Sequence, residues 1–207
     1  GSTQNDEVLT LSGDGAAGAL DVLGGGGQDA LTGGTKNDTI DGAGGQDAID
    51  GKGGADHISG GAANDTITIG SKTEFTSTVG TDTIDGGAGV DTITWTGAMN
   101  MTAASLGTIT NTEVWSIAAG SDFTISDAVL TNNPGVSFVF GGAGTLSGGE
   151  DTAGAALMTE AIKFTATGGD YAMKLIGSSG DDVYTFDATG TLTAADTIDG
   201  NAGTDTI

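Results

Sequence analysis

The sequence predicts an all-β fold in which short parallel strands stack into a β-solenoid. The first observation is a series of aspartates spaced nine residues apart, namely Asp29, Asp38, Asp47, Asp56 and Asp65. The second is an aliphatic residue two places after each aspartate, and the third is a glycine-rich pentad before it. A short fixed period of this kind is typical of architectures in which every repeat adds one strand and one turn.

Composition restricts the classes of partner. The chain has 28 acidic residues against 5 basic ones and a formal net charge of −23, which would repel nucleic acid and anionic lipid headgroups. A hard cation is the natural counterion. There is no cysteine, which excludes disulfides and thiolate metal sites, and no apolar run approaches the roughly 20 residues of a membrane-spanning helix. We therefore expect neither nucleic-acid binding nor membrane insertion.

The repeated unit reads G-G-x-G-x-D-x-U-x, where U is a large aliphatic residue. Glycines at the first, second and fourth places are expected to adopt positive φ angles and to turn backbone carbonyls inward. The aspartate at the sixth place adds a carboxylate, and the residue at the eighth place is expected to be buried. Stacked loops of this kind offer the 6 to 8 oxygen ligands that calcium prefers. The pattern thus predicts several bound Ca²⁺ ions.

This nonapeptide resembles the calcium-binding repeat of the RTX family, whose fold is a right-handed parallel β-roll. The resemblance implies that two nonapeptides make one coil, so that loops 18 residues apart lie on the same edge. Asp29 would then pair with Asp47, Asp38 with Asp56, and Asp47 with Asp65. Three complete calcium sites follow from this block.

The expected calcium ligands are the first-place and third-place residues and the sixth-place aspartates of the repeats, with the aspartates of the flanking copies. They are Gly24, Gly26, Asp29, Gly33, Thr35, Asp38, Gly42, Gly44, Asp47, Gly51, Gly53, Asp56, Gly60, Ala62, Asp65, Asp82, Gly86, Ala88, Asp91, Asp182, Asp196 and Asp205.

The repeats divide the chain into three segments. Residues 1–94 form the first expected roll, residues 177–207 a second block, and residues 95–176 a β-rich segment between them. An irregular spacing predicts an inserted loop at residues 71–79. The stretch around Asp82 realigns on that around Asp196 with an offset of 114 residues, which indicates tandem modules. The first residue is not Met and the last falls within a repeat, so we expect a piece of a longer protein.

The middle segment lacks the glycine signature but contains strand-like runs at residues 108–110, 113–117, 122–125 and 136–140. Residues 155–162 could form one or two helical turns. Two interpretations fit this pattern: a continued solenoid with wider coils, or a β-sandwich inserted into the roll.

Three aromatic side chains could carry chemistry of their own. Trp95 and Trp115 could stack against sugars, but core positions are favoured for large aromatics in a solenoid of small residues. His57 is the only histidine and falls at the seventh place of a repeat, where its side chain should face solvent. A zinc site or a catalytic role for it is therefore disfavoured.

Residues 86–130 look like modules of RTX-type bacterial S-layer proteins and large surface adhesins, in which a repeat leads into an E-x-U-x-U strand, here residues 113–117. The resemblance implies type I secretion and folding in extracellular calcium. We expect a structural module at the bacterial cell surface that associates with itself, with neighbouring modules of its chain or with an outer-surface polysaccharide.

The chain is expected not to be an enzyme, since neither G-x-S-x-G nor H-E-x-x-H is present and the aspartates are occupied by the repeat. The alternative is the calcium-dependent folding or secretion domain of an RTX exoenzyme or toxin. An ice-binding face is disfavoured because the seventh-place series Ala30, Thr39, Ala48, His57 and Thr66 is too uneven.

Overall fold

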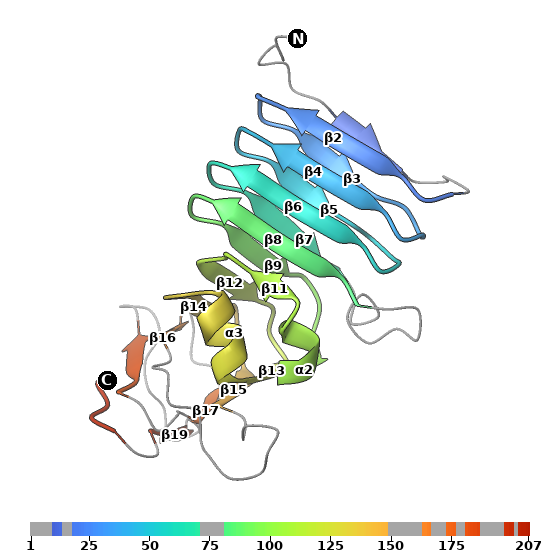
Figure 1. The fold of residues 1–207 in the computed structure, drawn as a ribbon. Helices are drawn as coiled ribbons and strands as arrows, with labels where there is room; N and C mark the ends of the chain where they lie inside the picture. The colour runs from blue at the N-terminus through green and yellow to red at the C-terminus, as the bar shows by residue number, and fades with distance from the viewer. Residues whose placement is uncertain are drawn as a thin grey trace. The chain divides into compact units, whose positions relative to one another are not determined.

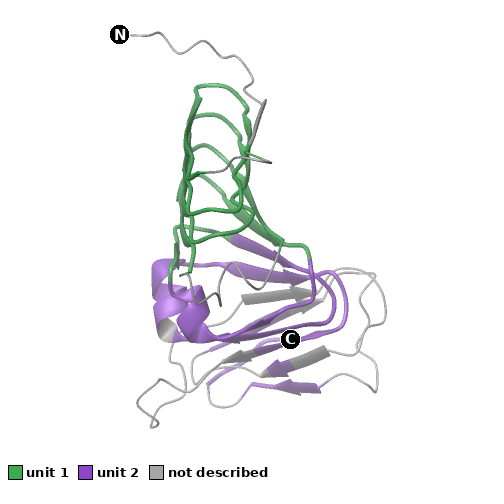
Figure 2. Cartoon of the chain, turned by 90° about the vertical axis from the view of Figure 1, so that its right-hand side faces the viewer, with its two compact units in different colours: residues 1–96, 108–113 green, residues 97–107, 114–207 purple. Residues whose placement is uncertain are grey.

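The computed structural model describes residues 10–13, 18–70, 81–148, 163–166, 173–176, 181–186, 197–200 and 203–207. The chain divides into two compact units (Figure 2). Unit 1 comprises residues 1–96 and 108–113, and unit 2 comprises residues 97–107 and 114–207.

Unit 1 is built from two parallel sheets, which appear as two layers of stacked strands joined by loops (Figure 1). The first sheet contains β1 (Thr10–Ser12), β3 (Ala30–Thr32), β5 (Ala48–Asp50), β7 (Thr66–Ile69) and β9 (Thr92–Trp95). The second contains β2 (Asp21–Gly25), β4 (Thr39–Ala43), β6 (His57–Ala62), β8 (Thr83–Ala88) and β11 (Ile109–Thr110). Because the chain alternates between the sheets and every pair is parallel, the predicted parallel β-solenoid is confirmed.

The strand register of unit 1 follows the nonapeptide. Ile49 of β5 pairs with Ile67 of β7, and Ile40 of β4 pairs with Ile58 of β6, so that like places of alternate repeats lie on top of one another. The eighth-place side chains point inward and form the core because successive residues of a strand face opposite sides. They are Leu31, Ile40, Ile49, Ile58, Ile67, Ile84 and Ile93, each at most 1% exposed.

The inserted loop predicted at residues 71–79 lies outside the described residues. The ladder nevertheless resumes in register beyond it, since Ile58 pairs with Ile84 and Ile67 with Ile93. The repeat therefore controls strand pairing on both sides of the interruption.

Unit 2 also consists of parallel ladders. One joins β12 (Val114–Ile117), β14 (Ser137–Phe140), β16 (Lys163–Ala166) and β18 (Val183–Phe186). The other joins β10 (Asn100–Met101), β13 (Ser121–Ile125), β15 (Gly144–Gly148), β17 (Met173–Ile176) and β19 (Thr197–Asp199). Two short helices, α2 (Ala103–Leu106) and α3 (Asp127–Asn132), complete its described elements.

The coils of unit 2 are wider than those of unit 1. Trp115 pairs with Phe138, 23 residues later, where the nonapeptide coil takes 18. The described strand pairs of unit 2 are parallel, whereas an immunoglobulin-like sandwich would need antiparallel sheets. Residues 155–162, which could form a helical turn, lie outside the described residues.

Aromatic side chains fill the interior of unit 2. Trp115 packs edge-on against Phe138, with ring centroids 5.3 Å apart, and against Phe123 at 6.5 Å. Trp115 is 0% exposed, and Trp95 of unit 1 is 1% exposed. The interpretation of both tryptophans as core residues is confirmed, and a sugar-stacking role is excluded by their burial.

Two further expectations concern the surface. The side chain of His57 is exposed on β6, as the seventh place of its repeat predicts. Across the described ranges, no helix is long and apolar enough to cross a membrane.

Candidate metal centre

The loops of unit 1 form two stacked rows, one along each edge of the solenoid. Row 1 links the second sheet to the first and contains residues 24–29, 42–47, 60–65 and 86–91. Row 2 links the first sheet to the second and contains residues 33–38 and 51–56, together with Asp82. Consecutive loops of a row belong to adjacent coils, so their residues at equal places are neighbours.

The sixth-place aspartates of each row form a continuous ladder. In row 1 the backbone N–H of Asp29 donates to Oδ1 of Asp47, that of Asp47 to Asp65 and that of Asp65 to Asp91, each at 2.8 Å. In row 2 the N–H of Asp38 donates to Asp56 and that of Asp56 to Asp82, also at 2.8 Å. The three pairs predicted from the 18-residue spacing therefore lie together, and the ladders extend across the insertion.

The second oxygen of these carboxylates has a different environment. Oδ2 of Asp38 accepts the backbone N–H of Gly34 at 2.6 Å. Oδ2 of Asp47, Asp56, Asp65 and Asp91 is buried and has no hydrogen-bond partner. A buried carboxylate oxygen without a partner is energetically costly, because it has lost its water and gained nothing in return.

The first-place glycines are required by space rather than by backbone conformation. A Cβ added to Gly24 would lie 2.5 Å from the carbonyl oxygen of Gly42 and 2.6 Å from Oδ2 of Asp29. The same two kinds of oxygen surround the first-place glycines Gly33, Gly42 and Gly60. Among the described residues, no first-place glycine has a positive φ angle, so that part of the sequence prediction is wrong. A carbonyl and a carboxylate oxygen converge where a side chain would otherwise stand.

From the loop 42–47 onward, the second and fourth places adopt the left-handed conformation, as predicted, whereas Gly25, Gly27 and Gly34 of the first two loops do not. Gly61 at the second place has a φ of 107°, and Gly45 and Gly54 at the fourth place have φ of 110° and 140°. Even non-glycine residues at the second place follow, with φ of 71° at Ala43 and 68° at Lys52. Because the strain of such residues is tolerated, the loop conformation is imposed by the stack and not by glycine alone.

The third-place residues tie neighbouring loops together. The N–H of Gly44 donates to the carbonyl of Gly25 at 2.9 Å, and the N–H of Gly53 donates to that of Gly34 at 3.0 Å. The carbonyl of Ala62 accepts the N–H of Gly45 at 3.2 Å. A carbonyl oxygen has two lone pairs, so third-place carbonyls retain one for a cation. The remaining third-place residues, Gly26, Thr35 and Ala88, lie at the corresponding points of their loops.

Burial disfavours the charged form of these carboxyls. Burial raises the pKa of Asp82 to about 7, and the pKa of Asp56 and of Asp65 to about 6. The hydrogen bond from the preceding aspartate's N–H acts in the opposite direction, and the like charges of neighbouring aspartates raise these pKa values further. The pKa values of Asp47 and Asp91 are raised for the same first reason. A cation in the row would relieve this penalty.

The donor set fits calcium. The loops offer carboxylate and carbonyl oxygens only, which are the ligands of hard cations. In the part of the chain that the structure describes, no three His, Cys, Asp or Glu side chains are grouped closely enough to hold a metal. Backbone carbonyls must therefore supply most of the ligands. The buried, unpartnered carboxylate oxygens are the direct sign that a positive charge completes these loops.

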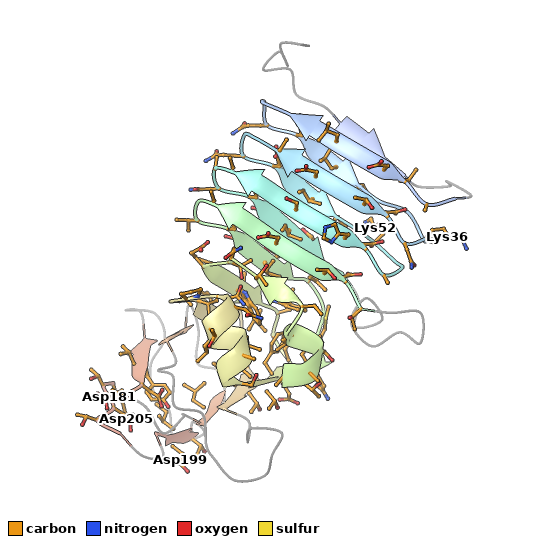
Figure 3. All side chains as sticks on the ribbon, viewed as in Figure 1. Lys36, Lys52, Asp181, Asp199 and Asp205 are labelled. Carbon is orange, nitrogen blue, oxygen red and sulfur yellow. The ribbon has the colours of Figure 1, made fainter. Side chains whose placement is uncertain are left out.

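The carboxyl-terminal block repeats the motif in unit 2. The N–H of Asp182 donates to Oδ1 of Asp205 at 3.0 Å, and the N–H of Thr204 donates to Asp181 at 2.7 Å. Asp181 and Asp205 lie close together in the carboxyl-terminal part of the chain (Figure 3). A Cβ on Gly200 would clash with Oδ2 of Asp205, as at the first-place glycines of unit 1. Asp196 lies outside the described residues.

One acidic residue of the ladder was not among the predicted ligands. Glu113 accepts the N–H of Asp91 through Oε2 at 2.7 Å. It belongs to no nonapeptide, and only a search for any acidic residue one coil beyond Asp91 could have found it.

Comparison with known proteins agrees with this geometry. The family of the RTX calcium-binding nonapeptide repeat matches in four copies, at residues 23–58, 49–71, 76–94 and 192–207. No curated protein and no solved structure shows significant similarity to the chain. The matched residues include both rows of unit 1 and the turn that contains Asp205.

Proposed function

We propose that the chain, which contains the RTX calcium-binding nonapeptide repeat, is a structural module whose folding is switched on by calcium. The observation that carries this proposal is the aspartate ladder of rows 1 and 2. Its carboxylates are buried, and several have an oxygen without any hydrogen-bond partner. Such an arrangement is unfavourable for the metal-free chain and favourable once an ion is bound.

The physical basis is the balance between charge repulsion and burial. The formal net charge is −23, and the strands of unit 1 are two to six residues long, so each buries little apolar surface. Short strands alone do not outweigh the conformational entropy lost on folding. Each calcium ion brings two positive charges and links two loops, and its binding energy becomes folding energy because the site does not exist in the unfolded chain.

Calcium removal tests this function. We expect the far-UV circular dichroism of the protein to show β structure and a cooperative thermal transition in calcium. Both should disappear in EGTA and return when calcium is added in excess. Magnesium at the same concentration is the control, because it demands a smaller octahedral site and should restore little structure. Spectra and melting curves that are identical with and without calcium would refute the proposal.

We further propose that the module belongs to a bacterial surface protein, an S-layer or adhesin, that assembles outside the cell. RTX proteins are generally secreted bacterial proteins. The 114-residue offset between the stretches around Asp82 and Asp196 supports a tandem array of modules. Light scattering in calcium should reveal self-association that EGTA reverses, whereas a monomer at all concentrations would argue against an array.

The second candidate is the calcium-dependent folding domain of a secreted exoenzyme or toxin, in which catalysis belongs to another part of the protein. RTX repeats occur in both kinds of protein. The sequence of the parent protein distinguishes them. Further copies of the 114-residue unit favour the array, and a hydrolase motif outside residues 1–207 favours the exoenzyme.

A further inference from the structure

The row 1 ladder continues beyond its last nonapeptide. The N–H of Asp65 donates to Oδ1 of Asp91 at 2.8 Å, and the N–H of Asp91 donates in turn to Oε2 of Glu113 at 2.7 Å. Glu113 therefore takes the position that an aspartate takes in each earlier coil. Both residues belong to unit 1.

The backbone shows why a glutamate, and not an aspartate, occupies this position. The N–H of Thr92, at a seventh place, donates to the carbonyl of Asp65 at 2.8 Å. The N–H of Glu113 makes the same bond to the carbonyl of Asp91, at 3.1 Å. Glu113 thus stands at the seventh place, one residue later than the ladder aspartates. Its additional methylene group lets the carboxylate reach back to the position of a sixth-place aspartate.

The first-place carbonyl group of the earlier loops also has a counterpart in the turn 111–113. A Cβ on Gly60 would clash with the carbonyl oxygen of Gly86, and a Cβ on Gly86 would clash with that of Asn111. Asn111 therefore presents its carbonyl where a first-place glycine would. The side-chain amide of Asn111 donates to Oδ1 of Asp85 at 2.8 Å, which holds the turn in place. A three-residue turn, 111–113, supplies both oxygens of the six-residue loop.

The loop 86–91, which faces the turn 111–113, contains a carboxylate oxygen without a hydrogen-bond partner. Asp91 is 0% exposed, and its Oδ2 has no hydrogen-bond partner. This oxygen lies 2.9 Å from the point where a Cβ of Gly86 would stand, and the carbonyl oxygen of Asn111 borders the same point. The carboxylate of Asp91 and the turn 111–113 thus face a common space, as adjacent loops do elsewhere in row 1.

We propose that a calcium ion binds between the loop 86–91 and the turn 111–113, with Glu113 as its last carboxylate ligand. It would be the last calcium site of row 1, and the turn 111–113 that forms one side of it lacks the nonapeptide sequence. The inference rests on the proposed function, because it assumes that the ordinary loops of row 1 bind calcium.

The number of bound ions tests the site. Native mass spectrometry in saturating calcium should show one ion fewer for Glu113→Gln than for the unmodified protein. Glu113→Asp keeps the charge, but its shorter side chain does not extend to the ladder position. This variant should therefore bind that ion at least about tenfold more weakly. Asp21→Asn is the matched control, since Asp21 is an exposed carboxylate that pairs in register with the seventh-place Thr39. It should bind as many ions as the unmodified protein.

Failure of this inference is distinct from failure of the proposed function. If the unmodified protein binds no calcium, the proposed function is wrong. If it binds calcium and Glu113→Gln binds the same number of ions, only the site at Glu113 is overturned.

A second measurement needs no variant and remains decisive if Glu113→Gln does not fold. In the folded protein, replacement of bound calcium by strontium should shift the side-chain carboxyl ¹³C signal of Glu113, while that of the exposed Asp21 should stay fixed. A Glu113 signal that the replacement leaves unchanged would overturn the site.

Discussion

Gly51 and Gly53 belong to the same loop of row 2 but have different surroundings. A Cβ on Gly51 would lie 2.5 Å from Oδ2 of Asp56, whereas the nearest atom to a Cβ on Gly53 is 4.0 Å away. We expect Gly51→Ala to destabilise the calcium-bound protein by about 1–3 kcal/mol, the usual cost of overpacking. Gly53→Ala should change stability by no more than about 0.5 kcal/mol. Urea unfolding in saturating calcium measures both, and equal effects would contradict the crowding at the first place.

The buried aspartates make a second prediction, which concerns pH. In the metal-free fold, the pKa of Asp82 is about 7 and those of Asp56 and Asp65 are about 6, all raised from 3.8. Because these folded-state values are raised, their contribution to stability is complete below about pH 4 and is lost as pH rises through 6 and 7. The metal-free fold should therefore be more stable at pH 5 than at pH 8. Far-UV circular dichroism in metal-free buffer measures this as the amount of β structure at each pH, and more β structure at pH 8 than at pH 5 would contradict it.

Calcium affinity should have the opposite dependence on pH. The ion binds carboxylates, so protons compete with it while Asp82, Asp56 and Asp65 titrate. Titration calorimetry should show tighter binding at pH 8 than at pH 5.5, with protons released on binding near pH 6.5. Binding that is independent of pH over this range would mean that these carboxyls do not take part.

Individual residues show how far the sequence could be used for prediction. The pairing of Asp29 with Asp47 was implied by the family resemblance, in which two nonapeptides make one coil, and the strict period then places like residues on the same edge. Glu113 could not be found in this way, because its turn is shorter and its carboxylate comes from the seventh place. The need for glycine at the first place was predicted, but its cause was not, since crowding by an adjacent coil is invisible in a single repeat.

At the scale of elements, the strand β6 shows the alternation on which the solenoid depends. Ile58 is 1% exposed and lies between Ile40 and Ile84 of the adjacent strands, while the neighbouring His57 side chain is exposed. We expect Ile58→Ala to cost about 2–5 kcal/mol of stability, because it removes a packed side chain from the core. His57→Ala should cost no more than about 0.5 kcal/mol. Thermal unfolding in calcium compares the two, and similar losses would contradict the inward position of the eighth place.

In the wider coils of unit 2, the positions of the strands were predicted, but the pairing of one strand with another was not. Residues 113–117, 122–125 and 136–140 alternate apolar and polar side chains, and β12, β13 and β14 occur there. Their assignment to two ladders could not be predicted, because no fixed period marks which strands are one coil apart. Trp115 and Phe138 pair only once the 23-residue coil is known.

At the scale of the whole molecule, the two units fill the interiors of their coils with different kinds of side chain. Unit 1 fills its core with one aliphatic residue per repeat and places buried carboxylates along its edges. Unit 2 places Trp115, Phe123 and Phe138 in contact inside its coils. Larger side chains bury more apolar surface per coil, so we expect unit 2 to depend less on calcium than unit 1.

Hydrogen–deuterium exchange of the aspartate amides tests the coupling of calcium to folding most directly. In the fold, the N–H of Asp47 donates to Asp65 and that of Asp38 to Asp56, so each reports on one row. In saturating calcium these amides should be strongly protected, and in EGTA at pH 7.5 they should exchange at the rate of an unfolded chain. Protection of both amides that is unchanged by EGTA would contradict the account.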